Sequence, residues 1–357
     1  MKLESLRKEI DAIDVELQEL ITKRAQLGVQ VGQIKNRQDN PQFFVPERES
    51  KILNAVIERN KNGLLSDKDM IQIFREIISA TRALEDPIRI AILGPEGTFT
   101  QAAAHSHFGH SFDTVYRPTI NDVFSAVELE KATYGVVPVE NSIEGVVNST
   151  LDRLFDSPLQ LCGEIELRVE HALLSQADDL SDVRKVMAHP QALAQCSNWL
   201  SRNLPDVELI PVSSNAKAVD VIRNDADSAA IASVAAAEIY HVGVLRTNIE
   251  DRVGNTTRFL IIGKIATRST GYDKTSILVS KKNEVGSLVE LLEPFARLGV
   301  NMSKIESRPS GKAMWEYVFF IDFEGHVDDE NIKQLFEELK QRAPLFKLLG
   351  SYPRSVS

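Results

Sequence analysis

The apolar residues at the start of the chain recur at alternating steps of three and four positions. They are Leu3, Leu6, Ile10, Ile13, Leu17, Leu20, Leu27, Val31 and Ile34, with Arg24 at one position of the same series. This spacing predicts one stripe along an α-helix, and a helix over residues 3–35 is about 50 Å long. Two shorter helical patterns follow at 47–59 and 66–84. Because two short helices cannot cover so long a stripe, we expect the first helix to pair with a second copy of the chain.

The length of 357 residues indicates two or three domains, and a hydrophobic content of 43% with 26% charged residues is typical of globular proteins. The net charge of −10 argues against nucleic acid or an anionic membrane as partner. Two cysteines without metal spacing indicate a reducing compartment. With no signal peptide and no long apolar run, we expect a soluble, cytoplasmic protein.

A cation at Arg24 interrupts the apolar stripe, and burying it is costly unless an anion pairs with it. Arg7, Lys35 and Arg48 lie at or beside the same stripe, and Glu49 follows the last of them. One interpretation is a coiled-coil dimerisation arm in which Arg24 pairs with a glutamate. The other is that these basic residues form a pattern with a function.

The stretches LRKEIDAID, KRAQLGVQVGQIK and PERE resemble the all-helical chorismate mutase family over residues 1–86. The resemblance implies a three-helix, intertwined dimeric domain in which cations clamp the two carboxylates and Glu49 bonds the substrate hydroxyl. The catalytic residues that it implies are Arg7, Arg24, Lys35, Arg48, Glu49, Thr81 and Glu85. Arg7 and Lys35 lie about 42 Å apart along one helix, so Arg7 must come from a partner subunit.

Three positions depart from one well-known version of this family pattern. That version has an acidic residue at Val45, a serine at Thr81 and, at Glu85, a glutamine that faces the ether oxygen of the substrate. A glutamate donates a hydrogen bond only when it is protonated. We therefore expect mutase activity to fall as pH rises, and Glu85→Gln to remove this trend. The alternative is that Glu85 is a solvated residue at a helix end.

Strand and helix patterns alternate after a linker at 85–87 and predict an α/β domain with mainly parallel sheets, split into two lobes around a cleft. A β-branched run at 135–139 ends in Asn141 and Ser142. Ligands bind at the carboxyl ends of strands in such sheets, so these two side chains are candidates for substrate contact. The alternative is that they cap the next helix.

The motifs GPEGTFT (94–100), VPVENS (137–142) and NTTRF (255–259), together with His189-Pro190-Gln191 and Gln195, resemble the prephenate dehydratase family. The resemblance covers residues 90–263 and implies a two-lobed, periplasmic-binding-protein-like domain over 87–266. It implies Thr257 as the catalytic residue. The substrate-binding residues that we predict are Thr98, Asn141, Ser142, Gln195 and Arg258. Position 188 is alanine here where some relatives have serine, so no role is assigned to it.

Prephenate loses carbon dioxide and its ring hydroxyl together. The departing hydroxyl needs a proton or a hydrogen bond, which Thr257 would donate or relay, while Arg258 or helix amides hold a carboxylate. Alone, Thr257 is also compatible with a strand residue whose hydroxyl is satisfied. His105, His107 and His110 are spaced as metal ligands could be, but without carboxylate or cysteine support we assign them to a solvated face.

A linker at 267–273 precedes strand and helix patterns in the order βαββαβ, which predicts an α+β ferredoxin-like domain over 273–352. The stretches GSLV (286–289) and ESRP (306–309) resemble the amino-acid-sensing ACT domain. The resemblance implies that phenylalanine binds at the helix start under a closing ESRP loop. The effector residues are Gly286, Ser287, Leu288, Val289, Glu306, Ser307, Arg308 and Pro309. The alternative is a simple dimerisation unit.

Together these features predict a bifunctional enzyme that rearranges chorismate to prephenate and converts prephenate to phenylpyruvate, with inhibition by phenylalanine. We expect a homodimer or higher homo-oligomer, no metal or organic cofactor, and no nucleic-acid or membrane partner. The alternative is a small-molecule-sensing binding protein without catalysis. It is less favoured because the sequence shows no helix-turn-helix or basic DNA-reading helix.

Overall fold

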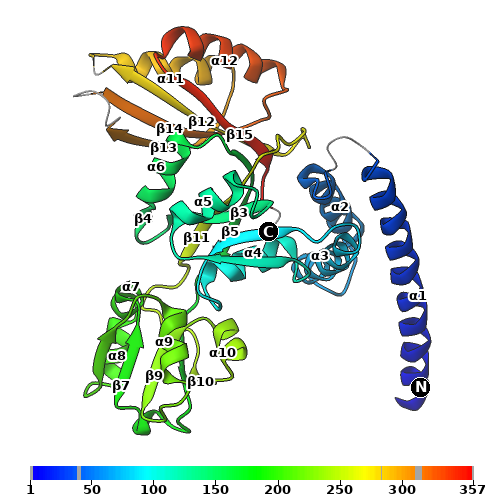
Figure 1. The fold of residues 1–357 in the computed structure, drawn as a ribbon, viewed down its shortest axis with the longest axis vertical. Helices are drawn as coiled ribbons and strands as arrows, with labels where there is room; N and C mark the ends of the chain where they lie inside the picture. The colour runs from blue at the N-terminus through cyan, green and yellow to red at the C-terminus, as the bar shows by residue number, and fades with distance from the viewer. Residues whose placement is uncertain (1–2, 38–41, 283, 310–315, 356–357) are drawn as a thin grey trace.

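The computed structural model describes residues 3–37, 42–282, 284–309 and 316–355. Its amino-terminal region is helical, as expected (Figure 1). The helices are α1 (Leu3–Lys35), α2 (Pro46–Arg59) and α3 (Asp67–Ala83). Ser66 caps α3 by accepting a hydrogen bond from the Asp69 amide. Acidic residues in the first turn stabilise the helix, because their negative charge lies near the positive end of its dipole. None of the described helices is long and apolar enough to cross a lipid bilayer.

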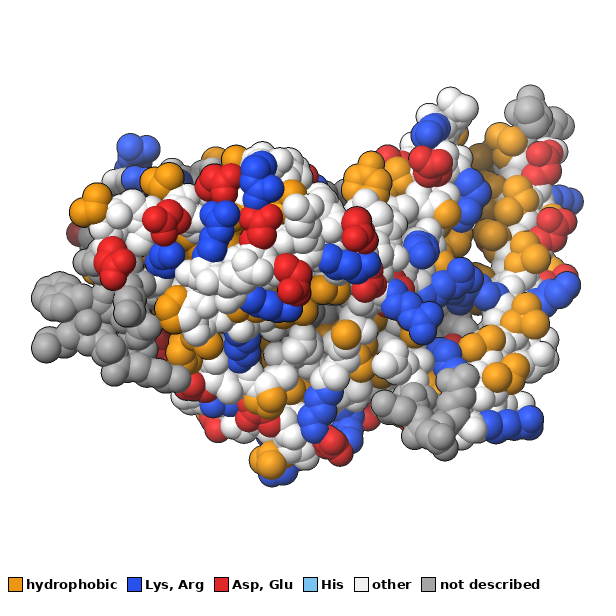
Figure 2. Space-filling model, turned by 90° about the horizontal axis from the view of Figure 1, so that it is seen from above, with side chains coloured by type: hydrophobic (Ala, Val, Ile, Leu, Met, Phe, Trp, Pro, Cys, Tyr) orange, Lys and Arg blue, Asp and Glu red, His pale blue; other side chains and the backbone are white. Residues whose placement is uncertain are grey.

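Helix α1 contacts α3 at Gly28 and Gly32, its buried residues in the described structure. A Cβ atom on Gly28 would lie 2.3 Å from Cγ2 of Thr81, so a glycine is needed for this approach. The rest of the apolar stripe is uncovered: Leu3 and Leu20 are 64% and 63% exposed. Figure 2 shows hydrophobic side chains along this helix, at the right edge of the molecule. Within one chain, α1 therefore leaves most of its apolar stripe in water.

The first lobe contains a sheet in the order β2-β1-β3-β11-β5, with β4 paired to β3. Its strands are β1 (Arg89–Leu93), β2 (Asp113–Arg117), β3 (Tyr134–Asn141), β4 (Gly145–Val146), β5 (Gln160–Arg168) and β11 (Thr256–Gly263). Its helices are α4 (Phe99–Phe108), α5 (Ile120–Glu128) and α6 (Asn148–Asp156). Buried aliphatic side chains of β3 and β11 pack against α4 on one face and α5 on the other.

The second lobe has a sheet in the order β10-β6-β9-β7-β8. Its strands are β6 (Ala172–Ser175), β7 (Lys185–Ala188), β8 (Glu208–Pro211), β9 (Ser228–Ala232) and β10 (Gly243–Arg246). Its helices are the 3₁₀ turn Leu180–Asp182, α7 (Pro190–Gln195), α8 (Ser197–Asn203), α9 (Asn215–Ile222) and α10 (Val234–Tyr240). Helices α7 and α8 are separated at Cys196, and Asp251 accepts hydrogen bonds from the first amides of α8.

Both sheets are mixed, so the expectation of mainly parallel sheets is wrong. Strands β1, β2 and β3 are parallel, as are β7, β8 and β9, whereas β11 is antiparallel to β3 and β5. Strand β6 is likewise antiparallel to β9 and β10. The chain crosses between the lobes from β5 to β6 and returns from β10 to β11. Because the two crossings run in opposite directions, the strands that flank them pair antiparallel: β5 with β11 in the first lobe and β6 with β10 in the second.

The carboxyl-terminal region follows the expected βαββαβ order in an antiparallel sheet, β13-β14-β12-β15. Its elements are β12 (Asp273–Lys282), α11 (Ser287–Arg297), β13 (Met302–Pro309), β14 (Glu316–Glu324), α12 (Glu330–Arg342) and β15 (Phe346–Pro353). Helices α11 and α12 cover one face of the sheet, and the other face shares a core with α5 and α6 of the first lobe. The carboxyl-terminal region is therefore packed on the first lobe, as Figure 1 shows.

Two further expectations for this part of the chain are wrong. Residues 306–309 lie within β13 and not in a loop, because their alternating exposure fits an edge strand paired with β14. Residues 267–273 are not a free linker: Thr267 is buried and donates a hydrogen bond to the Ser351 carbonyl. Strand β15 also approaches β5 so closely that a Cβ atom on Gly350 would lie 2.3 Å from the Leu161 carbonyl oxygen.

The expectation of a solvated face is wrong for His105 and His107, which are half-buried, whereas His110 is exposed. His110 contacts Glu76 of α3 at 2.7 Å, and His105 stacks on His110 at 4.4 Å. His107 packs beside Phe44 at a centroid distance of 6.1 Å. The reason is that α3 docks on the carboxyl end of α4, which places these rings in the contact between the helical region and the first lobe.

Candidate active sites and effector site

Four of the predicted mutase residues come together where α1 meets α3. Arg24 Nη1 donates hydrogen bonds to Thr81 Oγ1 at 2.7 Å and to the Ile77 carbonyl at 3.3 Å. Lys35 Nζ lies 3.0 Å from Glu85 Oε2. Arg24 and Lys35 are about three turns apart on one face of α1, and Thr81 and Glu85 are about one turn apart. The two cations thus line one wall, each held by a polar side chain of α3 or the residues just after it.

The other predicted mutase residues lie elsewhere. Arg7 is about 26 Å along α1 from Arg24. Arg48 is exposed on α2. Glu49 faces the first lobe, where it forms an ion pair with the buried Arg82. Burial raises the pKa of Glu49, although Arg82 opposes the shift.

Glu49 is thus already paired with a cation in this structure, and its contact with the substrate hydroxyl stays a prediction. Glu49 is paired in this way because the Arg82 guanidinium is buried. The guanidinium also donates a hydrogen bond to the Phe108 carbonyl at 2.8 Å and lies 5.2 Å from the Phe44 ring centre. A buried guanidinium needs a counter-ion, and Glu49 supplies it. This pair ties the helical region to the carboxyl end of α4.

A pocket of about 580 Å³ lies between the two lobes of the α/β region. Thr98, Asn141 and Thr257 line it from the first lobe, and Gln195 and Asn215 line it from the second. Thr98 caps α4 by accepting a hydrogen bond from the Gln101 amide, and Ser214 caps α9 in the same way. The positive ends of both helices therefore border the pocket and favour an anionic ligand.

The orientation of the Asn141 amide determines the hydrogen-bonding state of Thr257. Asn141 Oδ1 accepts hydrogen bonds from the amides of Ile143 and Glu144, so Nδ2 must face the opposite way. Nδ2 donates to Thr257 Oγ1 and to Asn255 Oδ1, both at 2.8 Å. Within the described residues, the Thr257 hydroxyl has no acceptor for its own proton. That proton is free for a ligand in the pocket.

The alternative that Asn141 and Ser142 cap the next helix is wrong, because α6 begins only after Val147. Asn141 instead closes the turn between β3 and β4. Ser142 Oγ accepts a hydrogen bond from the Thr256 amide at 3.0 Å and contacts Asn255 Oδ1 at 3.4 Å. Ser142 does not line the pocket, so it supports Asn255 from behind.

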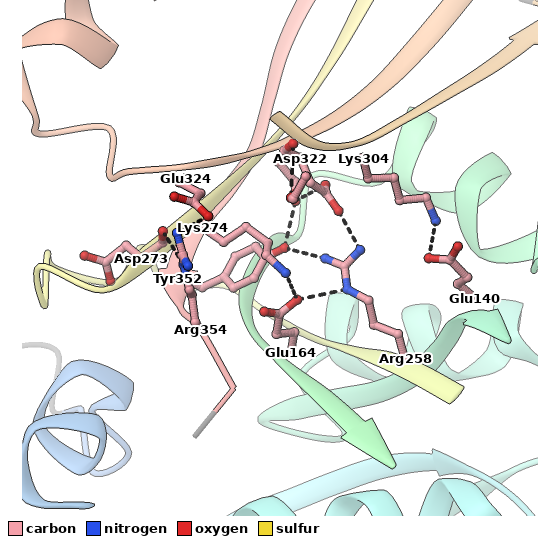
Figure 3. Close-up of polar contacts among 12 residues, drawn as sticks. Glu140, Glu164, Arg258, Asp273, Lys274, Lys304, Asp322, Glu324, Tyr352 and Arg354 are labelled. Carbon is pink, nitrogen blue, oxygen red and sulfur yellow. Dashed lines mark hydrogen bonds and ion pairs between the residues drawn. The ribbon is translucent and has the colours of Figure 1, made fainter. Parts of the chain in front are cut away.

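Arg258 does not reach the pocket either, and the prediction that it holds a substrate carboxylate is wrong. Successive side chains of a strand point to opposite faces, so Thr257 and Arg258 cannot face the same ligand. The Arg258 guanidinium contacts Glu164, Asp322 and Tyr352 instead (Figure 3).

His171 is a pocket residue that the sequence analysis missed. It is 2% exposed, and its Nε2 lies 2.9 Å from Gln195 Oε1, which only accepts hydrogen bonds. The network therefore assigns the proton to Nε2 and a lone pair to Nδ1, which is buried and has no partner in the described structure. Burial lowers the pKa of His171, although the bond to Gln195 opposes the shift. A lone histidine between two apolar runs was the available sequence signal.

The predicted effector residues lie at the start of α11 and on β13. Gly286 precedes α11 with φ of +82°, and nothing lies within 4 Å of the place of a Cβ atom. Val289 is 72% exposed. Arg308 on β13 lies 3.1 Å from Asp152 and donates to the Asn148 carbonyl of α6 at 3.0 Å. The helix start is open, and β13 touches the first lobe.

Three family models match consecutive parts of the chain. They are chorismate mutase type II at residues 6–86, prephenate dehydratase at 90–267 and the ACT domain at 275–341. Among solved structures, a prephenate dehydratase from Arthrobacter aurescens in complex with L-Phe is similar, with a TM-score of 0.69 and 33% identity over 75% of this chain and 90% of that chain. The prephenate dehydratase from Staphylococcus aureus is also similar, with a TM-score of 0.63 and 28% identity over 74% of this chain and 100% of that chain.

Full-length relatives match almost from end to end. A bifunctional chorismate mutase/prephenate dehydratase from Aquifex aeolicus is 46% identical over 99% of both chains. One from Pseudomonas aeruginosa is 45% identical over 99% of this chain and 98% of its own. The order of the family models is also the order of the helical, two-lobed and carboxyl-terminal regions of the structure. The chain therefore belongs to the family of bifunctional chorismate mutase/prephenate dehydratases and has both enzymatic activities.

Proposed function

We propose that the mutase works at the α1–α3 contact, that the dehydratase works in the interlobe pocket, and that phenylalanine binds the carboxyl-terminal domain. The domains are 1–86, 87–266 and 273–352. The observation that carries the proposal is the Asn141–Thr257 hydrogen bond, which leaves the Thr257 proton directed to a ligand. Folds of the intertwined helical, periplasmic-binding-protein-like and ferredoxin-like types fit the element orders.

The mutase reaction is a Claisen rearrangement that needs no nucleophile, only a folded substrate and donors near the ether oxygen. Arg24 and Lys35 bind the substrate carboxylates, and Glu85 faces the ether oxygen. Arg7 reaches the site from a partner subunit, and Arg48 closes it from α2. The exposed apolar stripe of α1 supports a homodimer, since a second copy would remove it from water.

The dehydratase reaction breaks two bonds of prephenate. The bond from the ring carbon to the carboxylate breaks, its electron pair enters the ring, and carbon dioxide leaves. The bond from the ring to the hydroxyl breaks, and the hydroxyl leaves as water after taking a proton. Thr257 donates to this oxygen, while the helix starts at Thr98 and Ser214 hold the carboxylates. His171 accepts the hydroxyl hydrogen through Nδ1 and orients the leaving group.

The effector site lies at Gly286–Val289 of α11 and Glu306–Pro309 of β13. Support comes from the open space at Gly286 and from the relative from Arthrobacter aurescens, whose structure is in complex with L-Phe. Feedback inhibition requires that phenylalanine bind an inactive state more tightly than the active one. The buried free thiols of Cys162 and Cys196 support a cytoplasmic location.

One assay on the full chain tests both activities. Chorismate absorbance should fall and phenylpyruvate should appear. Arg24→Ala should abolish the first step but leave conversion of added prephenate, and Thr257→Val should do the reverse. A chain that binds chorismate and prephenate but converts neither would support the binding-protein alternative.

A further inference from the structure

Two ion pairs connect strands of the interlobe pocket to the carboxyl-terminal sheet (Figure 3). Arg258 of β11 contacts Asp322 of β14 at 2.5 Å, and Glu140 of β3 contacts Lys304 of β13 at 2.6 Å. Each first-lobe partner is next in sequence to a pocket residue, since Arg258 follows Thr257 and Glu140 precedes Asn141. The pairs thus begin one peptide bond from the hydrogen bond that orients the Thr257 hydroxyl.

The two pairs are also joined to each other across the strands. Arg258 lies opposite Glu140 in the β3–β11 register, as Thr257 lies opposite Asn141. The register shifts directly after Arg258, where Phe259 lies opposite Pro138 and Val139 is left over as a bulge. A bulge re-aims the side chains beside it and locally disrupts the ladder. The bulge therefore lies within two residues of both pocket residues, Asn141 and Thr257.

Arg258 is the centre of a buried cluster whose charges balance. Glu164 accepts from Arg258 Nε at 2.9 Å and from Lys274 at 2.7 Å. Tyr352 accepts from Arg258 Nη2 at 3.0 Å. Glu164 and Tyr352 are 2% and 0% exposed. In so little water, each charge depends on its partners, so a displacement of β14 is transmitted to Arg258.

Strand β13 joins the second pair to the proposed effector residues. Lys304, Glu306 and Arg308 alternate with more exposed residues, so they share the face turned toward the first lobe. Lys304 binds Glu140 and Arg308 binds Asp152, with Glu306 between them. Because β13 is an edge strand of the described sheet, a ligand that engages Glu306 or Arg308 can shift it without breaking a second ladder.

We propose that the Glu140–Lys304 and Arg258–Asp322 pairs couple strand β13, which carries proposed effector residues, to Asn141 and Thr257. Phenylalanine then controls dehydration by displacing the side chains of Asn141 and Thr257. The inference rests on the proposed effector site. It assigns Arg258 and Glu140 as positioning residues, which act through Thr257 and Asn141 and do not touch the substrate.

The test compares Lys304→Met with the wild-type full chain. Dehydratase rates are measured with and without saturating phenylalanine, and phenylalanine binding is measured by calorimetry. We expect phenylalanine still to bind Lys304→Met, but the ratio of uninhibited to inhibited rate to fall at least about fivefold. The exchange Glu140→Lys with Lys304→Glu should return that ratio to within about twofold of the wild type.

The matched control is Lys264→Met, which removes an ion pair of similar length between Lys264 and Glu130 at the far end of β11. It should leave the basal rate and the inhibition ratio unchanged. Undiminished inhibition of Lys304→Met would overturn the coupling while leaving the effector site intact. A wild-type chain that neither binds nor responds to phenylalanine would overturn the effector site, and the coupling with it.

Discussion

In the interlobe pocket, the chemistry available to each side chain depends on which of its atoms is already hydrogen-bonded. Asn141 uses its oxygen for two turn amides, which forces its nitrogen onto Thr257. Gln195 accepts from His171 and donates to Glu144 at 3.2 Å. Within the part of the chain that the structure describes, the Thr257 hydroxyl lacks an acceptor for its proton, and His171 Nδ1 lacks a donor. A leaving hydroxyl can satisfy both at once.

Two substitutions distinguish the roles of the two ring nitrogens of His171. His171→Asn keeps an acceptor near the place of Nδ1, whereas His171→Gln keeps only the donor to Gln195. We expect the dehydratase kcat of His171→Gln to fall about 10²-fold, the usual scale for a group that assists proton transfer, and that of His171→Asn to fall less. Mutase turnover of the same preparations is the control. Equal losses in the two variants would show that the Nδ1 position is not used.

A pH dependence follows from the same histidine. Burial lowers the pKa of His171 below its usual 6.5, so the ring stays neutral at pH 6.5 and gains a proton only in more acidic solution. Protonation occupies Nδ1 and removes the acceptor. Dehydratase kcat should therefore persist through pH 6.5 and decline below it. An acid limb with its midpoint above pH 6.5, or one unchanged in His171→Gln, would contradict this assignment.

Among the elements, the contact of α1 with α3 leaves no room for a side chain at Gly28. A methyl group on Gly28 would collide with Cγ2 of Thr81, whose hydroxyl accepts from Arg24. Gly28→Ala should therefore push Thr81 away from Arg24, lower mutase kcat/KM at least about tenfold, and destabilise the helical region by about 1–3 kcal/mol. Both effects are measurable, by steady-state kinetics and by urea denaturation.

The rescue of this variant is specific. Thr81→Ser removes Cγ2 but keeps the hydroxyl, so adding it to Gly28→Ala should restore most of the mutase activity. Dehydratase activity should be the same in all of these variants. If the double variant is no better than Gly28→Ala, the collision with Thr81 is not the cause of the loss.

For the whole molecule, the proposed mutase site requires residues of two chains. Arg7 and Arg24 lie on one straight helix, about 26 Å apart, so they can meet at one substrate only if two chains contribute. Arg7→Ala and Arg24→Ala should each be inactive as mutases. An equimolar mixture, after subunit exchange, should regain up to about one quarter of wild-type activity, because half of the dimers contain one intact site. Full activity of Arg7→Ala, or no gain on mixing, would refute the shared site.

The sequence by itself determined the helices of the amino-terminal region and the order of the three regions. Heptad spacing, the Ser66 cap and alternating strand and helix patterns are local signals, and the helical region follows them to within two residues. Three motifs in order were sufficient to predict the prephenate dehydratase region, and Thr98, Asn141, Gln195 and Thr257 do line one pocket. These predictions succeeded because each depends on residues near one another in the chain, or on motifs that can be read one by one.

Only the tertiary structure decided the partner of each charged side chain. Arg258 faces Asp322, 64 positions away, and Glu49 faces Arg82, 33 positions away. No periodicity encodes either choice, since a buried charge is paired with whatever opposite charge the packing brings near. The same holds for His171, whose free nitrogen exists because Gln195 happens to hold the other one. Local sequence determines the secondary structure of the backbone, and long-range packing determines which polar atoms remain available to hydrogen-bond a ligand.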